Sequence, residues 1–200
     1  DSAESGSDYL VQVDCRNRFG NHVDSAFVVN LLSLSTLQDD LGYVIANLPG
    51  AADYEPDIQY NSSEERNSVH RLGTGKWQVT LPGLGGSSGT GSVQVTAAGV
   101  EGTVCRVTSW TAGRVATVAC RDHDGSLIDT AFDLTYMKGR GLKFENSHNV
   151  AFLLADRPTT ASYTPSTGYR FSTAGIAPRV YRTDRGVYSV KLEGQPLGGS

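Results

Sequence analysis

The four histidines of this 200-residue chain are the first candidates for chemistry, and their spacing argues against catalysis. None stands at the spacing of a metal-ligand pair, and none lies beside a nucleophile in a known catalytic motif. They are His22, His70, His123 and His148. The stretch GLGGSSGTG at 83–91 lacks the order of a nucleophile elbow and the lysine of a phosphate-binding loop. We therefore expect a protein that is not an enzyme and that uses no cofactor and no metal.

Two aspartates recur at matching places in the chain. Asp24 and Asp129 each stand near the start of a predicted strand, and each is followed by Ser or Thr. Carboxylate oxygens suit calcium ions and sugar hydroxyls, so both aspartates are candidate ligand-binding residues. The alternative interpretation is local hydrogen bonding at a turn or bulge.

Two loops with the pattern Tyr-x-Pro-x-x-x-Tyr carry stronger candidates for contact with a partner. Aromatic rings with a hydroxyl suit sugar faces and protein hot spots, and a proline holds such a loop in shape at little entropic cost. The alternative is that each loop packs onto its own domain. The candidate residues are Tyr54, Tyr60, Tyr163 and Tyr169.

The three cysteines predict one disulfide bond. Cys105 and Cys120 lie symmetrically about the turn at 112–113, which makes them opposite neighbours on paired strands, within the separation a disulfide accepts. Two buried free thiols are the alternative. Cys15 has no predicted partner and is either free, buried or bonded to another chain.

The composition is typical of β-rich extracellular proteins. Hydrophobic residues make up 38% and charged residues 19%, with 23 glycines and one methionine. The net charge of −4 provides no basic face for a phosphate backbone, so we expect no nucleic-acid partner. No apolar run approaches the roughly 18 residues that span a bilayer, so we expect no membrane insertion. The first residues contain no signal peptide, so in an exported protein it was removed before residue 1.

An internal repeat organises the chain. Residues 9–32 match 114–137 at an offset of 105, 43–61 match 152–170 at 109, and 75–83 match 186–194 at 111. The drift in offset places small insertions in loops. We predict a complete repeat over 42–138 and a partial second repeat formed by 8–32 plus 150–194, from both chain ends. The strands equivalent to 92–110 have no second copy.

Within each block apolar and polar residues alternate, the pattern of half-buried strands separated by turns such as Asp124-Gly125. The fold class we predict is all-β, with duplicated antiparallel β-sandwich modules of jelly-roll-like form. A β-propeller-like arrangement is the alternative. Only 33–40 is predicted as a helical turn. The predicted strands are 9–15, 23–31, 43–48, 67–72, 76–82, 92–98, 103–110, 115–121, 127–137, 150–156, 178–183 and 187–192.

Several motifs carry a resemblance to known modules: VHRLGTGKWQVTLPGL, SVQVTAAG, VCRVTSW, VACRDHDGSLIDTAF and DLTYM. They look like the modules of about 100 residues found in tandem in secreted proteins of actinobacteria and related bacteria. More distantly, they are similar to jelly-roll sandwiches at phage tail-fibre tips. The resemblance covers 43–137 fully and both flanks in part. It implies non-catalytic, surface-exposed proteins engaged in adhesion or recognition, often as oligomers, and it brings no family active site.

Together these observations favour a secreted, non-catalytic recognition module that binds carbohydrate or a cell-surface protein through the tyrosine loops. One alternative is a structural or assembly subunit of an extracellular multimer, in which unpaired edge strands at the incomplete repeat accept a strand from a neighbour. In that case the partner is a second copy, in a homo-oligomer, or another assembly protein. A hydrolytic enzyme is the second alternative.

Overall fold

The computed structural model describes residues 2–5, 8–11, 19, 40–85, 91–99, 102–111, 114–138, 151–172 and 174–194. These residues form antiparallel β-sheets, joined by loops and one short 3-10 turn, η2 (Thr167–Tyr169). The predicted all-β class is therefore confirmed. Within this part of the chain, no helix has the length and apolar character needed to cross a membrane.

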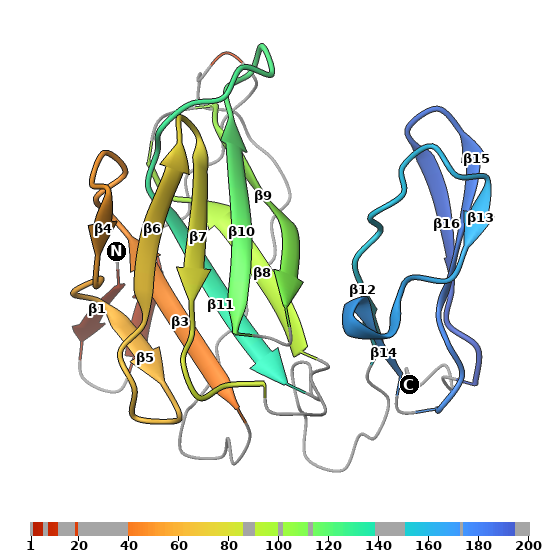
Figure 1. Cartoon of the computed structure of the whole chain (residues 1–200), viewed down its shortest axis with the longest axis horizontal. Helices are drawn as coiled ribbons and strands as arrows, with labels where there is room; N and C mark the ends of the chain where they lie inside the picture. Colours follow the sequence, from red (N-terminus) through yellow and green to blue (C-terminus); the bar gives the residue numbers. More distant parts are fainter. Residues whose placement is uncertain are drawn as a thin grey trace.

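Two sheets make up the central part of the molecule (Figure 1). The first has five strands in the order β4 (Asp53–Tyr54), β6 (Ser68–Gly73), β7 (Lys76–Thr80), β10 (Val115–Arg121) and β9 (Val104–Thr111). The second has four strands in the order β5 (Gln59–Asn61), β3 (Leu41–Ala46), β11 (Phe132–Lys138) and β8 (Gly91–Ala97).

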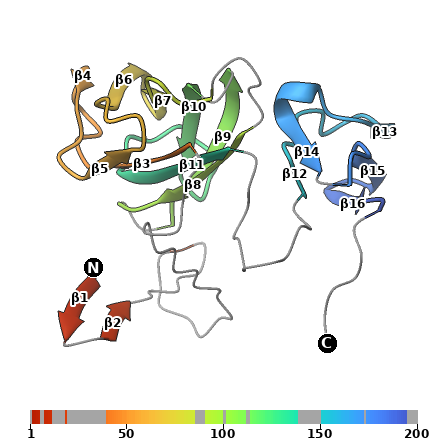
Figure 2. The same cartoon turned by 90° about the horizontal axis from the view of Figure 1, so that it is seen from below.

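The two sheets lie in separate layers and share one hydrophobic core (Figure 2). Alternate residues of each strand point inward, as the period of two in the sequence predicts. Trp77 of β7 and Phe132 of β11 meet across the layers with ring centroids 5.3 Å apart, and both side chains are fully buried. Burial of such large apolar surfaces is the main contribution to the stability of a β domain.

A disulfide bond joins the two strands at one edge of the five-stranded sheet. Cys105 of β9 is paired in register with Cys120 of β10, and their sulfur atoms are bonded. The predicted disulfide is therefore confirmed. It links residues 15 apart in the chain and buries both side chains beside the core.

The C-terminal segment forms two small sheets beside the β9 side of the central part (Figure 1). One contains β12 (Ala151–Leu153) and β14 (Arg170–Ser172), and the other contains β13 (Ser162–Tyr163), β15 (Arg179–Asp184) and β16 (Val187–Lys191). The Trp110 indole of β9 donates a 2.9 Å hydrogen bond to the Gly168 carbonyl and meets the Tyr169 ring edge-on, at 4.9 Å between centroids. At the other end, β1 (Ser2–Ser5) pairs with β2 (Asp8–Val11).

The strands differ from the predicted ones at a few places. The strand predicted from residue 127 begins only at Phe132, because Leu127 forms an isolated bridge with Arg121 and Asp129 turns its carboxylate to another hairpin. The short strands β1, β4, β5, β13 and β14 were not predicted. The expected strand at 23–31, most of that at 9–15 and the helical turn at 33–40, except residue 40, lie outside the described residues.

Candidate functional site

Two of the four candidate tyrosines use their hydroxyl groups inside the fold. The Tyr54 hydroxyl accepts a hydrogen bond from the Leu48 amide at 3.4 Å, and the Tyr163 hydroxyl accepts one from the Arg157 amide at 3.1 Å. Tyr54 packs against the core, and burial raises the pKa of its hydroxyl, while the Leu48 hydrogen bond opposes that shift. Tyr163 is itself buried. Both side chains thus fasten a loop to its own strands.

The other two candidate tyrosines pack against aromatic neighbours. Tyr60 of β5 stacks on Tyr43 of β3, with ring centroids 6.0 Å apart. Tyr169 lies against Trp110 and the central core. The structure therefore places Tyr54, Tyr60 and Tyr163 on three different sheets and Tyr169 in η2, and each side chain is half-buried or buried in packing contacts.

Asp129 holds the end of the β6–β7 hairpin. Its carboxylate accepts hydrogen bonds from the Arg71 guanidinium at 2.6 Å and from the Gly75 amide at 2.7 Å. The Arg71 hydrogen bond and the Gly75 amide hold the pKa of Asp129 below its ordinary value, against an opposing effect of burial. Asp24, its counterpart in the repeat, lies outside the described residues. No group of three or more His, Cys, Asp or Glu side chains in the described part of the chain is placed to hold a metal ion.

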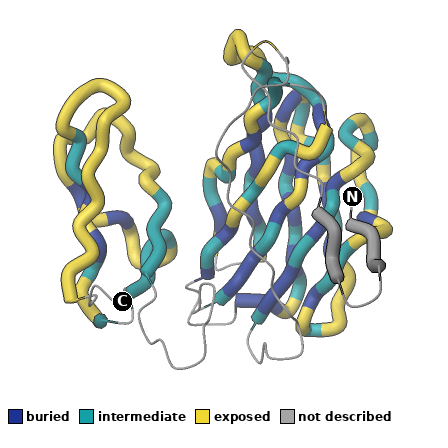
Figure 3. Tube along the Cα trace, turned by 180° about the vertical axis from the view of Figure 1, so that it is seen from behind, coloured by how far each residue is buried: buried dark blue, intermediate teal, exposed yellow. Residues whose placement is uncertain are grey.

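A different feature stands out in the C-terminal segment, where β12 and β16 are among the strands that have an unpaired edge. Within the described residues, β16 pairs only with β15, and β12 pairs only with β14. Strands with an unpaired edge present a row of free amide and carbonyl groups, which is a template for pairing with another chain. All five residues of β16 are exposed (Figure 3).

The β15–β16 hairpin has the same register as the β6–β7 hairpin of the central part. Adding 111 to each number converts the pairs Val69–Val79 and Arg71–Trp77 into the pairs Val180–Val190 and Arg182–Tyr188. The register shifts at the corresponding place in both hairpins, after Arg71 and after Arg182. Each hairpin turn contains a glycine with positive φ, Gly75 at 65° and Gly186 at 74°.

The neighbouring strands repeat the same arrangement. The pair Tyr54–Val69 that joins β4 to β6 corresponds to Tyr163–Val180, which joins β13 to β15. The stacked rings of Tyr43 and Tyr60 between β3 and β5 have their equivalent in Phe152 and Phe171 between β12 and β14, 5.8 Å apart. Structurally Tyr60 therefore corresponds to Phe171, two residues beyond the Tyr169 that the sequence match aligns with it.

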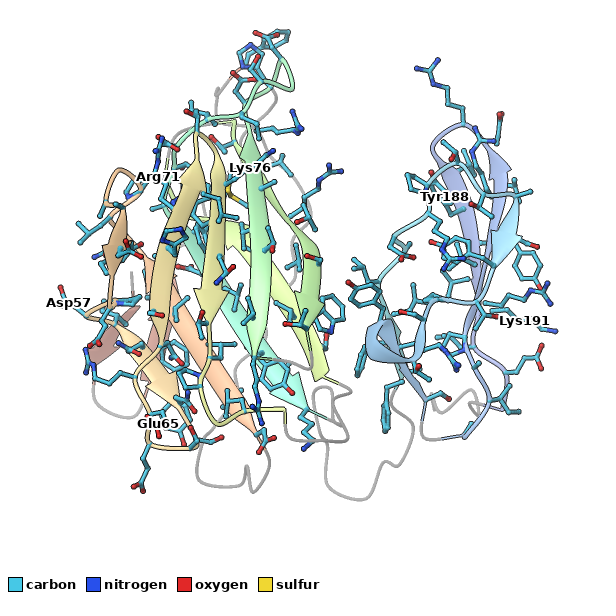
Figure 4. The ribbon with its side chains drawn as sticks, viewed as in Figure 1. Asp57, Glu65, Arg71, Lys76, Tyr188 and Lys191 are labelled. Carbon is cyan, nitrogen blue, oxygen red and sulfur yellow. A yellow bond between two sulfur atoms is a disulfide. The ribbon has the colours of Figure 1, made fainter. Side chains whose placement is uncertain are left out.

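Burial is what separates the two hairpins. Trp77, Val79 and Leu81 are fully buried under β3, β11 and the rest of the four-stranded sheet. Their counterparts in the C-terminal segment are 41%, 50% and 44% exposed, and we call them the open face: they are Tyr188, Val190 and Leu192. Figure 4 labels Tyr188 and Lys191 on β16 and, on the central hairpin, Arg71 and Lys76.

The open face was not among the predicted sites, although the sequence held the signal for it. Residues 75–83 match 186–194, so the core positions of one hairpin predict core positions in the other. The sequence also lacks a second copy of 92–110. Taken together, these two facts predict a core-forming surface without its full cover.

The comparisons with known proteins give no further guide to the site. The chain matches no protein-family model, and neither a curated protein nor a solved structure is significantly similar to it.

Proposed function

We propose that this chain is a non-catalytic assembly module of the extracellular space, and that its open face accepts strands from a partner. On this proposal the central part is a complete β-sandwich of jelly-roll-like form, and residues 151–194 are an incomplete second copy of its first five strands. The shared register of β4, β6 and β7 with β13, β15 and β16 supports the duplication. So do the matching hydrogen bonds of Tyr54 and Tyr163.

The observation that carries the proposal is the exposure of the open face. A side chain of this size contributes about 1.5–3 kcal/mol when it is fully buried, and contiguous exposed apolar patches mark interaction sites. The open face has the backbone geometry of a core and lacks the cover of one. It also borders the unpaired edge of β16, so a docking strand gains backbone hydrogen bonds and apolar burial together.

The compartment and the absence of catalysis are parts of the same proposal. The Cys105–Cys120 disulfide favours an oxidising compartment, because such bonds persist chiefly in secreted proteins. A binding role needs only surface complementarity, and the open face presents three exposed apolar side chains at alternate positions of one strand and its end.

Binding of a glycan or a cell-surface protein through the tyrosine loops is the other function that the sequence favoured. The contacts made by Tyr54, Tyr60, Tyr163 and Tyr169 assign these side chains to packing. We therefore place recognition second to assembly. Glycan binding that is lost on Tyr54→Ala and Tyr163→Ala, with the fold intact, would reverse that order.

Light scattering at several concentrations tests the assembly function. We expect the mass of the wild-type chain to rise with concentration, and Val190→Lys to hold it at the monomer value because a charge replaces an apolar contact. Ser189→Lys is the matched control, since it places the same charge on the other face of the same strand. A wild-type chain that stays monomeric throughout would contradict assembly.

A further inference from the structure

The internal repeat shows which segment has the pattern of the missing cover. Residues 9–32 match 114–137, which contain β10 and most of β11. In the central part β10 pairs with β7, and β11 pairs with β3. The counterparts of β7 and β3 are β16 and β12, and each of these has an unpaired edge within the described residues. We propose that residues 9–32 of a second copy of this chain dock on β12 and β16 and cover the open face. This inference rests on the proposed assembly function and names its partner.

The apolar pattern of 9–32 fits this place. Ala116, Val118 and Cys120 are the buried residues of β10 that face the core, and their counterparts at an offset of 105 are also apolar. The same holds for Phe132, Leu134 and Tyr136 of β11. The six counterparts are Val11, Val13, Cys15, Phe27, Val29 and Leu31. Docked in the same register, Phe27 meets Tyr188 as Phe132 meets Trp77.

An ion pair supplies a second, independent match. Asp129 holds Arg71 and the Gly75 amide at the β6–β7 turn. The residues that correspond to these three in the repeat are Asp24, Arg182 and Gly186. Among the described residues Arg182 forms no side-chain ion pair, so its guanidinium is available for a carboxylate. On this inference Asp129 makes the contact within the central sandwich, and Asp24 makes the equivalent contact between copies. The shared contact explains why the aspartate recurs in the repeat.

The donor comes from another copy because β2, at the start of the donor segment, lies apart from β12 and β16 in this chain. The β1–β2 hairpin lies at the opposite end of the molecule from β12–β16 in both views (Figures 1 and 2). Within the described residues β2 pairs only with β1, which leaves its other edge open. β1 precedes β2 and pairs with it antiparallel, as β9 does with β10. The hairpin can therefore keep β1 while β2 pairs with β16.

Thiol cross-linking between two chains that carry cysteines at different positions tests whether residues 9–32 dock on β16 and in which register. The central pair Thr117–Gln78 predicts that Gln12 lies opposite Ser189, both on the outer face, where substitution leaves the core intact. One chain carries Gln12→Cys and the other Ser189→Cys, both in a Cys15→Ser background. Mixed and oxidised, they should form a disulfide-linked dimer. Gln12→Cys mixed with Val187→Cys, two residues out of register, is the matched control and should give several-fold less.

The outcomes separate the donor from the assembly function. Assembly of the wild-type chain without this cross-link means that another segment covers the open face, which overturns the inference alone. Closure within a single chain carrying both cysteines, with no product from the mixture, means that the chain's own N-terminal segment docks, and this also overturns it. A monomer at every concentration overturns the inference and the assembly function together.

A charge exchange provides a measurement that does not depend on thiol chemistry. We expect Asp24→Arg or Arg182→Asp to weaken assembly by about tenfold or more, and the two together in one chain to restore most of it. Arg185→Asp is the control, because Arg185 is exposed on the same hairpin outside the predicted contact. Equal weakening by all three single substitutions, with no restoration, would overturn the Asp24–Arg182 contact.

Discussion

Trp77 and Tyr188 donate their side-chain hydrogen bonds to equivalent proline carbonyls, and they differ in burial. The Trp77 indole reaches the Pro49 carbonyl at 3.4 Å, and the Tyr188 hydroxyl reaches the Pro158 carbonyl at 2.8 Å. Pro49 and Pro158 are 109 residues apart, the offset of the surrounding repeat. Trp77 is fully buried and Tyr188 is 41% exposed. On the proposed assembly, the hairpin thus holds Tyr188 in place for the cover that a partner supplies.

Truncation of these two side chains should have unequal effects on stability. We expect Trp77→Ala to lower the free energy of unfolding by about 3–5 kcal/mol, because it leaves a large cavity in a packed core. Tyr188→Ala should lower it by less than about 1 kcal/mol in a dilute monomer, as is usual at exposed positions. Denaturant unfolding followed by circular dichroism measures both values. Equal losses would show that Tyr188 is already covered within one chain.

The Arg71–Asp129 ion pair should make stability depend on pH. The pKa of Asp129 in the folded protein lies below its ordinary value of 3.8, chiefly because of the Arg71 hydrogen bond. The stabilisation is therefore fully present above 3.8 and is lost as pH falls through the lower folded value. We expect Asp129→Asn to cost about 2 kcal/mol at pH 7 and progressively less in acid.

Melting temperatures of Asp129→Asn and the wild type, measured from pH 7 down to pH 2.5, test this expectation. Asp57→Asn is the control, because Asp57 is exposed, and its difference from the wild type should stay small at every pH. A gap between Asp129→Asn and the wild type that does not narrow in acid would show that the loss comes from packing instead of charge.

The disulfide should stabilise the central sheets by a measurable amount. A closed loop of 15 residues corresponds to about 3 kcal/mol in the chain-entropy model. We expect the double substitution Cys105→Ala and Cys120→Ala to lower the denaturant midpoint, and reductant to lower that of the wild type to a similar extent. The double variant itself should not respond to reductant. A wild-type midpoint that reductant leaves unchanged would contradict the bond's contribution.

Tyr136 should limit stability at alkaline pH. Burial, and to a smaller extent the charge of Asp40, raise its pKa to about 12. The unfolded chain ionises this hydroxyl from about pH 10, so folding becomes less favourable between these values. Within the described residues the buried Tyr136 hydroxyl has no hydrogen-bond partner, so Tyr136→Phe should be neutral or slightly stabilising at pH 7.

Unfolding experiments at pH 7 and pH 11 on the wild type and Tyr136→Phe provide the check. The advantage of the phenylalanine variant should grow at pH 11. A loss of more than about 1 kcal/mol at pH 7 would instead indicate that the hydroxyl makes a hydrogen bond in solution.

Sequence patterns predicted the elements whose causes are local. The alternation in 76–82 gave β7, and the symmetry of Cys105 and Cys120 about one turn gave a cross-strand disulfide. Short strands such as β4 and β13 were missed, because two paired residues produce no period that can be recognised.

The candidate site was harder to predict because burial depends on residues distant in the chain. Tyr54 and Tyr163 are of a residue type that is common at binding sites, yet their hydroxyl groups accept hydrogen bonds from amides six residues away. Asp129 is of a residue type that binds cations, yet its carboxylate accepts a hydrogen bond from Arg71, 58 residues away. Val190 has the same type and register as Val79, and only the presence of opposing strands decides which is buried.

The contact of Trp110 with Gly168 and Tyr169 acquires a further meaning if copies join through their two ends. It ties the C-terminal segment to β9 of the central sheet, so it helps to set the angle between one copy and the next. Repeated at every junction, that angle either returns the series to its start, giving a closed ring, or advances it, giving an open helical filament. One indole would then contribute to the choice between a particle of fixed size and a polymer of indefinite length.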